Sequence, residues 1–208
     1  MIEVRDDGPI RVLTLNRPDK ANALTAEMLA GLADEVEKAI ADDAVNVLML
    51  TGAGRVFSAG ADLEEARSGL AVSPLWERLS GLIADAPLLT IAVLNGTVAG
   101  GAMGMVLACD LRVAVPGAKF FYPVMKLGFL PQPSDPKRLT QLVGPARAKL
   151  ILMAGMKATT EEALAWGLVD VVSEAPMEKA GALAEDACAA DRAHVAGIKA
   201  LFSPVEGD

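Results

Sequence analysis

The order of apolar runs along the chain predicts an α/β fold with parallel strand crossovers. Short apolar runs at residues 10–16, 46–51 and 90–94 end at asparagine or glycine, as buried strands commonly do. Between the first two runs, residues 25–41 place their apolar side chains on one face of a helix. A strand, a helix and a second strand in this order favour a right-handed parallel crossover.

The second half of the chain is predicted to be mainly helical. Asp135-Pro136 and Gly144-Pro145 place proline at the first helical position, where its missing N–H does no harm. Thr159-Thr160-Glu161-Glu162 has the pattern of a capping box before an apolar run. Helices are therefore expected from about residues 136, 145 and 160. The remaining elements expected are a helix at 101–109 and strands at 111–115 and 169–172.

Length and composition predict one soluble domain. A chain of 208 residues with 52% hydrophobic residues can bury a large core. The net charge of −8 disfavours a nucleic-acid partner, because a negative surface repels phosphate backbones. The apolar stretch 88–115 is interrupted by Asn95, several glycines and Asp110, so no membrane span is expected.

The cysteines and the N-terminus favour a cytoplasmic location. Cys109 and Cys188 lie far apart in the sequence, and the first residues lack the apolar stretch of a signal peptide. The pattern contains no metal-ligand cluster, so no metal is expected. The tail from Phe202 to Asp208 is a candidate for disorder.

Two loops at the carboxyl ends of predicted strands are the candidate site. Residues 57–63 (Phe-Ser-Ala-Gly-Ala-Asp-Leu) follow the strand at 46–51, and residues 95–104 follow the strand at 90–94. Ligands of open α/β sheets bind at this edge, and each loop leads into a helix start with free N–H groups. Two such groups can converge on one oxygen atom. The alternative is that both loops are ordinary tight turns in which glycine supplies unusual dihedral angles.

Several motifs in sequence order resemble the crotonase, or enoyl-CoA hydratase/isomerase, superfamily. They cover nearly the whole chain. The segments that carry the resemblance are Asn16-Arg17-Pro18, Lys20-Ala21-Asn22-Ala23-Leu24, Ser58-Ala59-Gly60-Ala61-Asp62, Asn95-Gly96 through Cys109-Asp110-Leu111-Arg112, Leu127-Gly128, Arg138-Leu139, Leu142-Val143-Gly144 and Ala165-Trp166-Gly167-Leu168-Val169.

The resemblance implies a crotonase-like spiral of β-β-α units, with a core at about 1–140 and a mainly helical part at about 141–208. It further implies that the N–H groups of Ala61 and Gly101 form an oxyanion hole for an enolate. Coenzyme A enters as part of an acyl-CoA substrate, and no bound cofactor is expected. The residues implied to frame coenzyme A are Lys20, Asn22, Ala23, Leu24, Ala59, Asp62 and Leu63, with Arg17 or Lys20 near phosphate.

The two glutamates that hydratases of this family use as acid and base are missing. Their positions correspond here to Gly104 and Val124, and the aspartate of dienoyl isomerases and aryl-CoA dehalogenases corresponds to Gln132. Neither Gly104 nor Val124 can carry a proton. General acid–base assistance contributes roughly 10² to 10⁴ per group, so water addition should be crippled.

Three residues are candidates for a substitute proton carrier. Asp135 precedes Pro136, where an aspartate more often caps the helix, and we favour that structural role. Tyr122 and Lys126 share a face with Val124 if residues 122–126 are extended. We favour a core aromatic and a surface lysine for these two.

The resemblance implies further helices after the one near Lys199, about fifty residues in family members, so the trimerisation helices are expected to be shortened in this chain. A homo-oligomer, a trimer or a hexamer, is still expected. The favoured function is an enzyme of fatty acid metabolism that stabilises an enolate, acting as an isomerase or as a lyase, with decarboxylation among the reactions expected of the site. The alternative is a non-catalytic acyl-CoA-binding protein.

Overall fold

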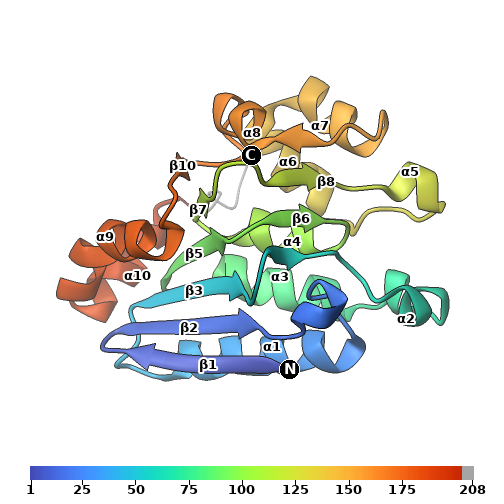
Figure 1. Cartoon of the computed structure of the whole chain (residues 1–208). Coiled ribbons are helices and arrows are strands. Elements are labelled where there is room, and N and C mark those ends of the chain that lie inside the picture. The colour runs from blue at the N-terminus through green and yellow to red at the C-terminus, as the bar shows by residue number, and fades with distance from the viewer. Residues whose placement is uncertain (203–208) are drawn as a thin grey trace.

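The computed structural model describes residues 1–202, so residues 203–208 of the predicted disordered tail lie outside the described part. Two sheets organise the protein (Figure 1). The six-stranded sheet has the order β1-β2-β3-β5-β7-β10, and the four-stranded sheet the order β4-β6-β8-β9. The strands are β1 (Ile2–Asp7), β2 (Ile10–Leu15), β3 (Val47–Gly52), β4 (Val56–Ser58), β5 (Leu89–Leu94), β6 (Thr97–Ala99), β7 (Leu111–Ala114), β8 (Lys119–Phe121), β9 (Ala158–Thr159) and β10 (Val171–Val172).

The predicted parallel crossovers are confirmed in the larger sheet. Strands β2, β3, β5, β7 and β10 are parallel neighbours, with Ile10 opposite Val47 and Val47 opposite Leu89. The sequence did not lead us to expect β1, which pairs antiparallel with β2. Its residues are mostly exposed, and an edge strand of this kind lacks the apolar run by which buried strands are recognised.

The five helices whose starts were predicted, α1, α4, α6, α7 and α8, begin within one residue of the expected positions. Thr159 and Glu162 form the expected capping box. The helices are α1 (Ala26–Ala41), α2 (Leu63–Arg67), α3 (Leu75–Asp85), α4 (Ala102–Ala108), α5 (Val124–Leu127), α6 (Asp135–Val143), α7 (Pro145–Leu152), α8 (Thr160–Trp166), α9 (Pro176–Ala189) and α10 (Arg192–Ala200), with 3₁₀ turns η1 (Pro18–Lys20) and η2 (Leu70–Val72).

Helices cover both faces of the larger sheet. On one face α1, α3 and α4 pack over the main core, and on the other α9 lies against β3, β5 and β7 (Figure 1). Each residue of β3 is buried, which explains why this strand is a continuous apolar run rather than an alternating one. The sheet therefore provides a rigid base for the loops at its carboxyl edge.

A unit of two strands and a helix occurs three times along the chain, with its first strand in the larger sheet and its second in the smaller one. Strand β3 leads into β4 and then α2, β5 into β6 and then α4, and β7 into β8 and then α5. Strands β4, β6 and β8 are parallel neighbours, so the segments that follow them lie at one edge. This confirms the expected spiral of β-β-α units, and Figure 1 shows α2 and α5 on the same side of the molecule.

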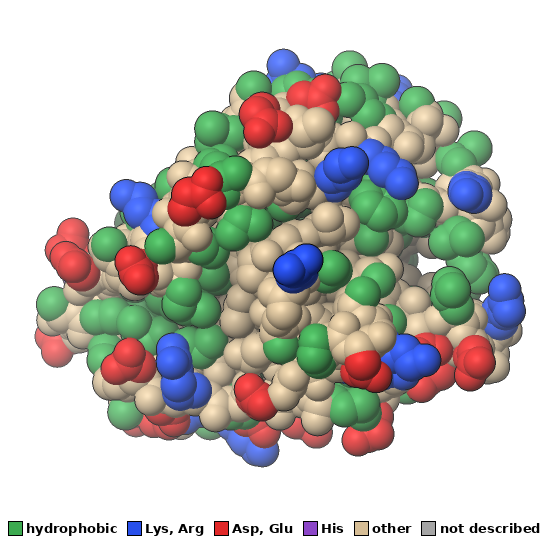
Figure 2. All heavy atoms as spheres, viewed as in Figure 1, with side chains coloured by type: hydrophobic (Ala, Val, Ile, Leu, Met, Phe, Trp, Pro, Cys, Tyr) green, Lys and Arg blue, Asp and Glu red, His purple; other side chains and the backbone are tan. Residues whose placement is uncertain are grey.

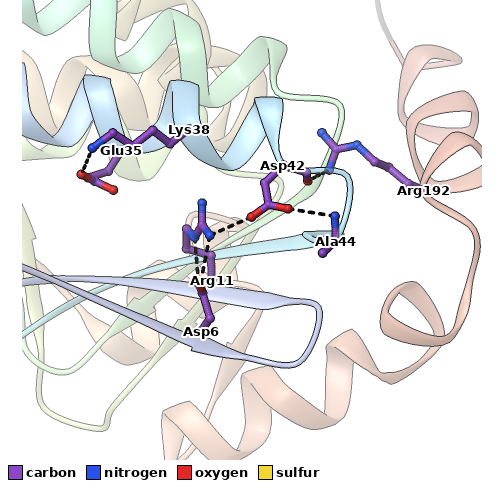
Figure 3. A network of polar contacts seen from close by, with 7 residues as sticks. All are labelled: Asp6, Arg11, Glu35, Lys38, Asp42, Ala44 and Arg192. Carbon is purple, nitrogen blue, oxygen red and sulfur yellow. Dashed lines mark hydrogen bonds and ion pairs between the residues drawn. The ribbon is translucent and has the colours of Figure 1, made fainter.

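Two arginines, Arg11 near the start of the described chain and Arg192 near its end, bind residues at the end of α1 and in the loop that follows (Figure 3). Arg11 on β2 binds Asp6 and Asp42 with distances of 2.7 and 2.9 Å. Arg192 on α10 donates to the carbonyl oxygens of Ile40, Asp42 and Val45. A cation at the carbonyl-rich end of α1 is favourable, and it holds the C-terminal helices against the core.

The visible surface carries acidic and basic side chains interspersed with apolar ones (Figure 2). Within residues 1–202, no helix is both long and apolar enough to cross a membrane.

Candidate functional site

The first loop is held against the segment that precedes α1. The Ser58 hydroxyl donates to the Asn22 carbonyl and accepts from Gly60 N–H. Leu24 N–H donates to Gly60 at 2.8 Å, and Asp62 N–H returns a bond to Leu24 at 2.8 Å. This parallel bridge places Ala61 opposite Leu24. Since the bridge uses the groups on either side of Ala61, the Ala61 N–H points away from Leu24.

The second loop comes from β6 and touches the first. Gly60 has φ of +91°, and a Cβ built on it would lie 2.7 Å from the Ala99 carbonyl oxygen. Gly100 has φ of +58° and lies 3.6 Å from the Gly60 Cα by the same construction. The positive φ favours glycine at both positions. At Gly60 the approach of the Ala99 carbonyl also leaves no room for a side chain.

Ala61 and Gly101 line the same cavity of about 350 Å³. Gly101 is the residue immediately before α4, so its N–H belongs to the unpaired donors of a helix start. Within residues 1–202, neither this N–H nor that of Ala61 has a hydrogen-bond acceptor. Two residues from adjacent loops, each with a backbone N–H that has no acceptor among residues 1–202, therefore line one cavity.

The cavity walls are mostly apolar and come from α2, η2, α3 and the segment around α5. Trp76 lies directly behind Gly101, where an added Cβ would come within 2.9 Å of its ring. The Trp76 ring N–H donates to the Leu70 carbonyl at 2.7 Å, which fixes the ring. The residues of the wall are Ala59, Leu63, Ala66, Arg67, Ala71, Trp76, Tyr122, Val124, Lys126, Leu127, Phe129, Leu130 and Gln132. Figure 2 shows the surface hollowed on this side, between α2 and α5.

A buried carboxyl lies behind this wall. Asp135 is only 1% exposed, and its Oδ2 accepts a hydrogen bond of 3.0 Å from the Tyr122 hydroxyl. Its other oxygen, Oδ1, has no hydrogen-bond partner among residues 1–202. Burial raises the pKa of Asp135 to about 7. The Tyr122 hydrogen bond and Arg138 act in the opposite direction, and Glu77 adds to the rise.

The favoured capping role of Asp135 is wrong. Helix α6 begins at Asp135 itself, its N-cap is Ser134, and no side chain caps the N-terminus. Glu77 of α3 holds this helix start instead, because it accepts from the Ser134 hydroxyl at 2.9 Å. The Asp-Pro pair was a sound signal for a helix start, but the carboxyl turns inward to Tyr122.

Gly104 gives this carboxyl its space. A Cβ built on Gly104 would lie 2.9 Å from Asp135 Oδ1 and 3.3 Å from Oδ2. Gly104 occupies the position that the resemblance assigns to a hydratase glutamate, and even the methyl group of alanine there would force Asp135 to shift. Val124, at the other such position, is buried and lines the cavity.

Substituting Gly104 by alanine is expected to lower the free energy of unfolding by about 1–3 kcal/mol, the usual cost of overpacking a core. Chemical denaturation measures this. Gly31→Ala in α1 is a matched control, because its Cβ meets nothing within 4 Å, and it should be neutral or stabilising. The double variant Gly104→Ala/Asp135→Ala should lose less than the two single costs added together. Additive costs would contradict the contact.

The extended segment that would place Tyr122 and Lys126 on one face does not form. Residues 124–127 form the short helix α5 rather than an extended segment, and Lys126 is exposed at the cavity rim. Tyr122 is buried in the core as predicted, but its hydroxyl is also hydrogen-bonded. Gln132 N–H approaches that hydroxyl at 3.5 Å, while its side chain binds the Ala71 carbonyl.

The residues predicted to frame coenzyme A lie on the first loop and on the segment before α1 that is hydrogen-bonded to it. Arg17 forms an ion pair of 2.8 Å with Asp62, and its hydrogen bond holds the pKa of Asp62 below its ordinary value. The Asn22 side chain is fully buried and binds the Ala53 and Val56 carbonyls. Lys20 and Leu63 are exposed, and Ala23 is half-buried. Arg17 and Asn22 thus have structural partners, a fact that spacing alone did not reveal.

Other reactive groups lie elsewhere. Cys109 is buried, and burial raises its pKa to about 12, so its thiol stays protonated and inert in the core. In the part of the chain that the structure describes, no group of His, Cys, Asp and Glu is arranged to hold a metal ion. A larger cavity of about 750 Å³ lies between α9, α10 and the amino ends of β5 and β7. It is therefore at the opposite edge of the sheet from the two loops.

Comparison with known proteins supports one family. A family model described as enoyl-CoA hydratase/isomerase matches residues 5–204. The probable enoyl-CoA hydratase EchA14 of Mycobacterium tuberculosis is 36% identical over 202 residues, covering 94% of this chain and 78% of the relative. The 4-chlorobenzoyl coenzyme A dehalogenase-2 of an Arthrobacter species is 33% identical over 208 residues, covering 95% and 75%.

Solved structures agree with the sequence comparison. The crystal structure of an enoyl-CoA hydratase from Bacillus anthracis superposes with a TM-score of 0.90 at 29% identity, covering 96% of this chain and 81% of that one. The architecture is therefore the crotonase-type α/β fold. The chain belongs to the enoyl-CoA hydratase/isomerase family.

Proposed function

We propose that this protein binds an acyl-CoA thioester and stabilises its enolate through the N–H groups of Ala61 and Gly101. The observation that carries the proposal is the pair of free backbone donors in one largely apolar cavity. Donors fixed by the fold do not reorganise when charge develops on the thioester oxygen, and each contributes roughly 10² to 10³ in rate. The name of one relative, 4-chlorobenzoyl coenzyme A dehalogenase-2, contains a coenzyme A thioester, which supports an acyl-CoA substrate for this protein.

Coenzyme A would lie along the first loop and the neighbouring segment of residues 20–24. The backbone of residues 20–24 and the side chains of Ala59 and Leu63 are available there, and Leu63 is 63% exposed. Lys20, exposed at the end of η1, is the better candidate for a phosphate, because the Arg17 guanidinium is already paired with Asp62. Coenzyme A enters and leaves as part of the substrate, and we propose no resident cofactor.

Isomerisation or decarboxylation suits this site better than hydration. Gly104 and Val124 carry no proton at the positions of the two hydratase glutamates, so activation of water has no obvious base. Decarboxylation delivers the enolate without a base, and isomerisation only moves a proton. The alternative function, a non-catalytic acyl-CoA-binding protein, is favoured by the same two residues.

The cellular setting belongs to the same proposal. Cys109 and Cys188 are both free thiols, which suits a reducing cytoplasm. A role in fatty acid metabolism and a homo-oligomer, a trimer or hexamer, follow from the family rather than from a feature of this chain.

Calorimetric titration with crotonyl-CoA and acetyl-CoA tests the proposal, with loss of the enoyl absorbance followed in the same samples. Binding of both thioesters is expected, with little or no hydration of crotonyl-CoA. Rapid hydration would contradict the preference for isomerisation or decarboxylation. Failure of both thioesters to bind would overturn the proposed function.

A further inference from the structure

The cavity wall contains one polar group that leads directly to a buried carboxyl. Tyr122 lines the cavity together with Ala61 and Gly101, and its hydroxyl lies 3.0 Å from Asp135 Oδ2. Asp135 does not line the cavity and is 1% exposed, so Tyr122 is the lining residue that joins the cavity to this carboxyl by a hydrogen bond. The segment after β8 supplies the phenol, and α6 supplies the carboxyl.

We infer that Tyr122 and Asp135 form a proton relay, in which Tyr122 is the catalytic residue and Asp135 is the positioning residue behind it. The inference rests on the proposed function, because the relay needs an acyl-CoA whose carbonyl lies on the two N–H groups. The proton is thus carried by two residues that occupy neither of the hydratase glutamate positions, which are Gly104 and Val124 in this chain. Helix α6 thus provides a carboxyl in the space that a side chain on α4 would fill.

The environment of Asp135 is costly for a purely structural carboxyl. One of its oxygens has no hydrogen-bond partner within residues 1–202, and a buried polar atom without a partner costs about 1–3 kcal/mol. Asparagine would have the same size without a charge to bury. Buried polar groups that are only partly satisfied are recurrent at functional sites, where stability is lost for activity.

The protonation of the pair suits transfer in both directions. Burial raises the pKa of Asp135 to about 7, so the ionised and neutral forms coexist near neutral pH. The charged groups that influence it are Glu77 from α3 and Arg138 from α6, and α4, which presents Gly104 to Asp135, carries no charged residue. Burial also raises the pKa of Tyr122 above its ordinary value, so Tyr122 stays neutral and passes protons on.

The proposed step is a proton transfer without a redox change. In 3-butenoyl-CoA, the C2–H bond breaks and its electron pair moves through C1 to the thioester oxygen, which becomes the enolate held by Ala61 and Gly101. The proton goes to the Tyr122 oxygen as the Tyr122 hydroxyl proton moves to Asp135. The reverse transfer delivers a proton to C4, so the double bond shifts to C2–C3 and crotonyl-CoA forms. Both residues return to their starting states.

The test uses the full-length protein and 3-butenoyl-CoA, with crotonyl-CoA formation followed by its enoyl absorbance. Tyr122→Phe and Asp135→Asn are each expected to lower kcat roughly 10²- to 10⁴-fold with little change in KM. The wild-type kcat should fall as the pH drops below about 7, where Asp135 becomes protonated and can no longer accept, and Asp135→Asn should lose that inflection. Asp110→Asn, the same chemical change at a hydrogen-bonded carboxylate outside this cavity, should retain kcat and the pH profile.

Calorimetric binding and thermal unfolding of each variant separate the possible failures. Turnover by the wild type that survives in both variants overturns the relay and leaves the proposed function standing. Binding of 3-butenoyl-CoA by the wild type without turnover also overturns the relay and favours the non-catalytic binder. Absence of binding by the wild type refutes the proposed function itself. A folded, binding variant that has lost turnover and the pH inflection supports the relay.

Discussion

The free energy of unfolding is expected to fall as the pH rises from about 4 to about 8, and Asp135→Asn is expected to remove most of this dependence. The pKa of Asp135 is about 7 in the folded protein and 3.8 ordinarily. Between these values the folded chain holds a proton that the unfolded chain has lost, so each rise in pH favours unfolding. The stabilisation is fully present below pH 3.8 and is lost as the pH passes 7, which amounts to roughly 4 kcal/mol.

Denaturant titrations at pH 5, 6, 7 and 8 measure this effect in the wild type and in Asp135→Asn. Other groups also titrate in this range, so the informative quantity is the difference between the two proteins at each pH. The variant should gain stability relative to the wild type as the pH rises. A constant difference across the series would mean that Asp135 is ionised throughout, and would remove the basis for the pH inflection expected in turnover.

Much of the fold was predictable because its signals are local. The apolar runs of β2, β3, β5 and β7, the amphipathic stripe of α1 and the capping box of α8 each depend on neighbouring residues. The edge strand β1 was missed because it is mostly exposed and carries no apolar run. The short strands β4, β6 and β8 are too brief for a periodic pattern, although they bring the two loops together.

The candidate site was predictable only where it depends on the backbone. Glycines marked the two loops, because a positive φ and a close approach favour glycine, while the resemblance to the family supplied Ala61 and Gly101 as the expected donors. The partner of Asp135 was not predictable, since Tyr122 lies on a different element and Gly104 on a third. Local reasoning about Asp-Pro favoured a helix cap, and the tertiary contact with Tyr122 overrode it.

Removal of the Ala61 N–H is expected to abolish most of the activity. Ala61→Pro replaces the donor with a ring carbon and sacrifices no hydrogen bond within residues 1–202, because the neighbouring bridge uses only Gly60 and Asp62. Loss of one such donor should lower kcat with 3-butenoyl-CoA roughly 10²- to 10³-fold. Steady-state kinetics measure the loss, and thermal unfolding checks that the variant is folded.

Free coenzyme A provides the control ligand, because it has no thioester carbonyl to occupy the oxyanion hole. Calorimetry should find its affinity for Ala61→Pro equal to that for the wild type, while the affinity for an acyl-CoA falls. Equal weakening of both ligands would mean that the proline has distorted the loop that binds coenzyme A. Unchanged turnover would show that Ala61 does not contact the thioester, and the enolate would then need donors other than the pair at Ala61 and Gly101.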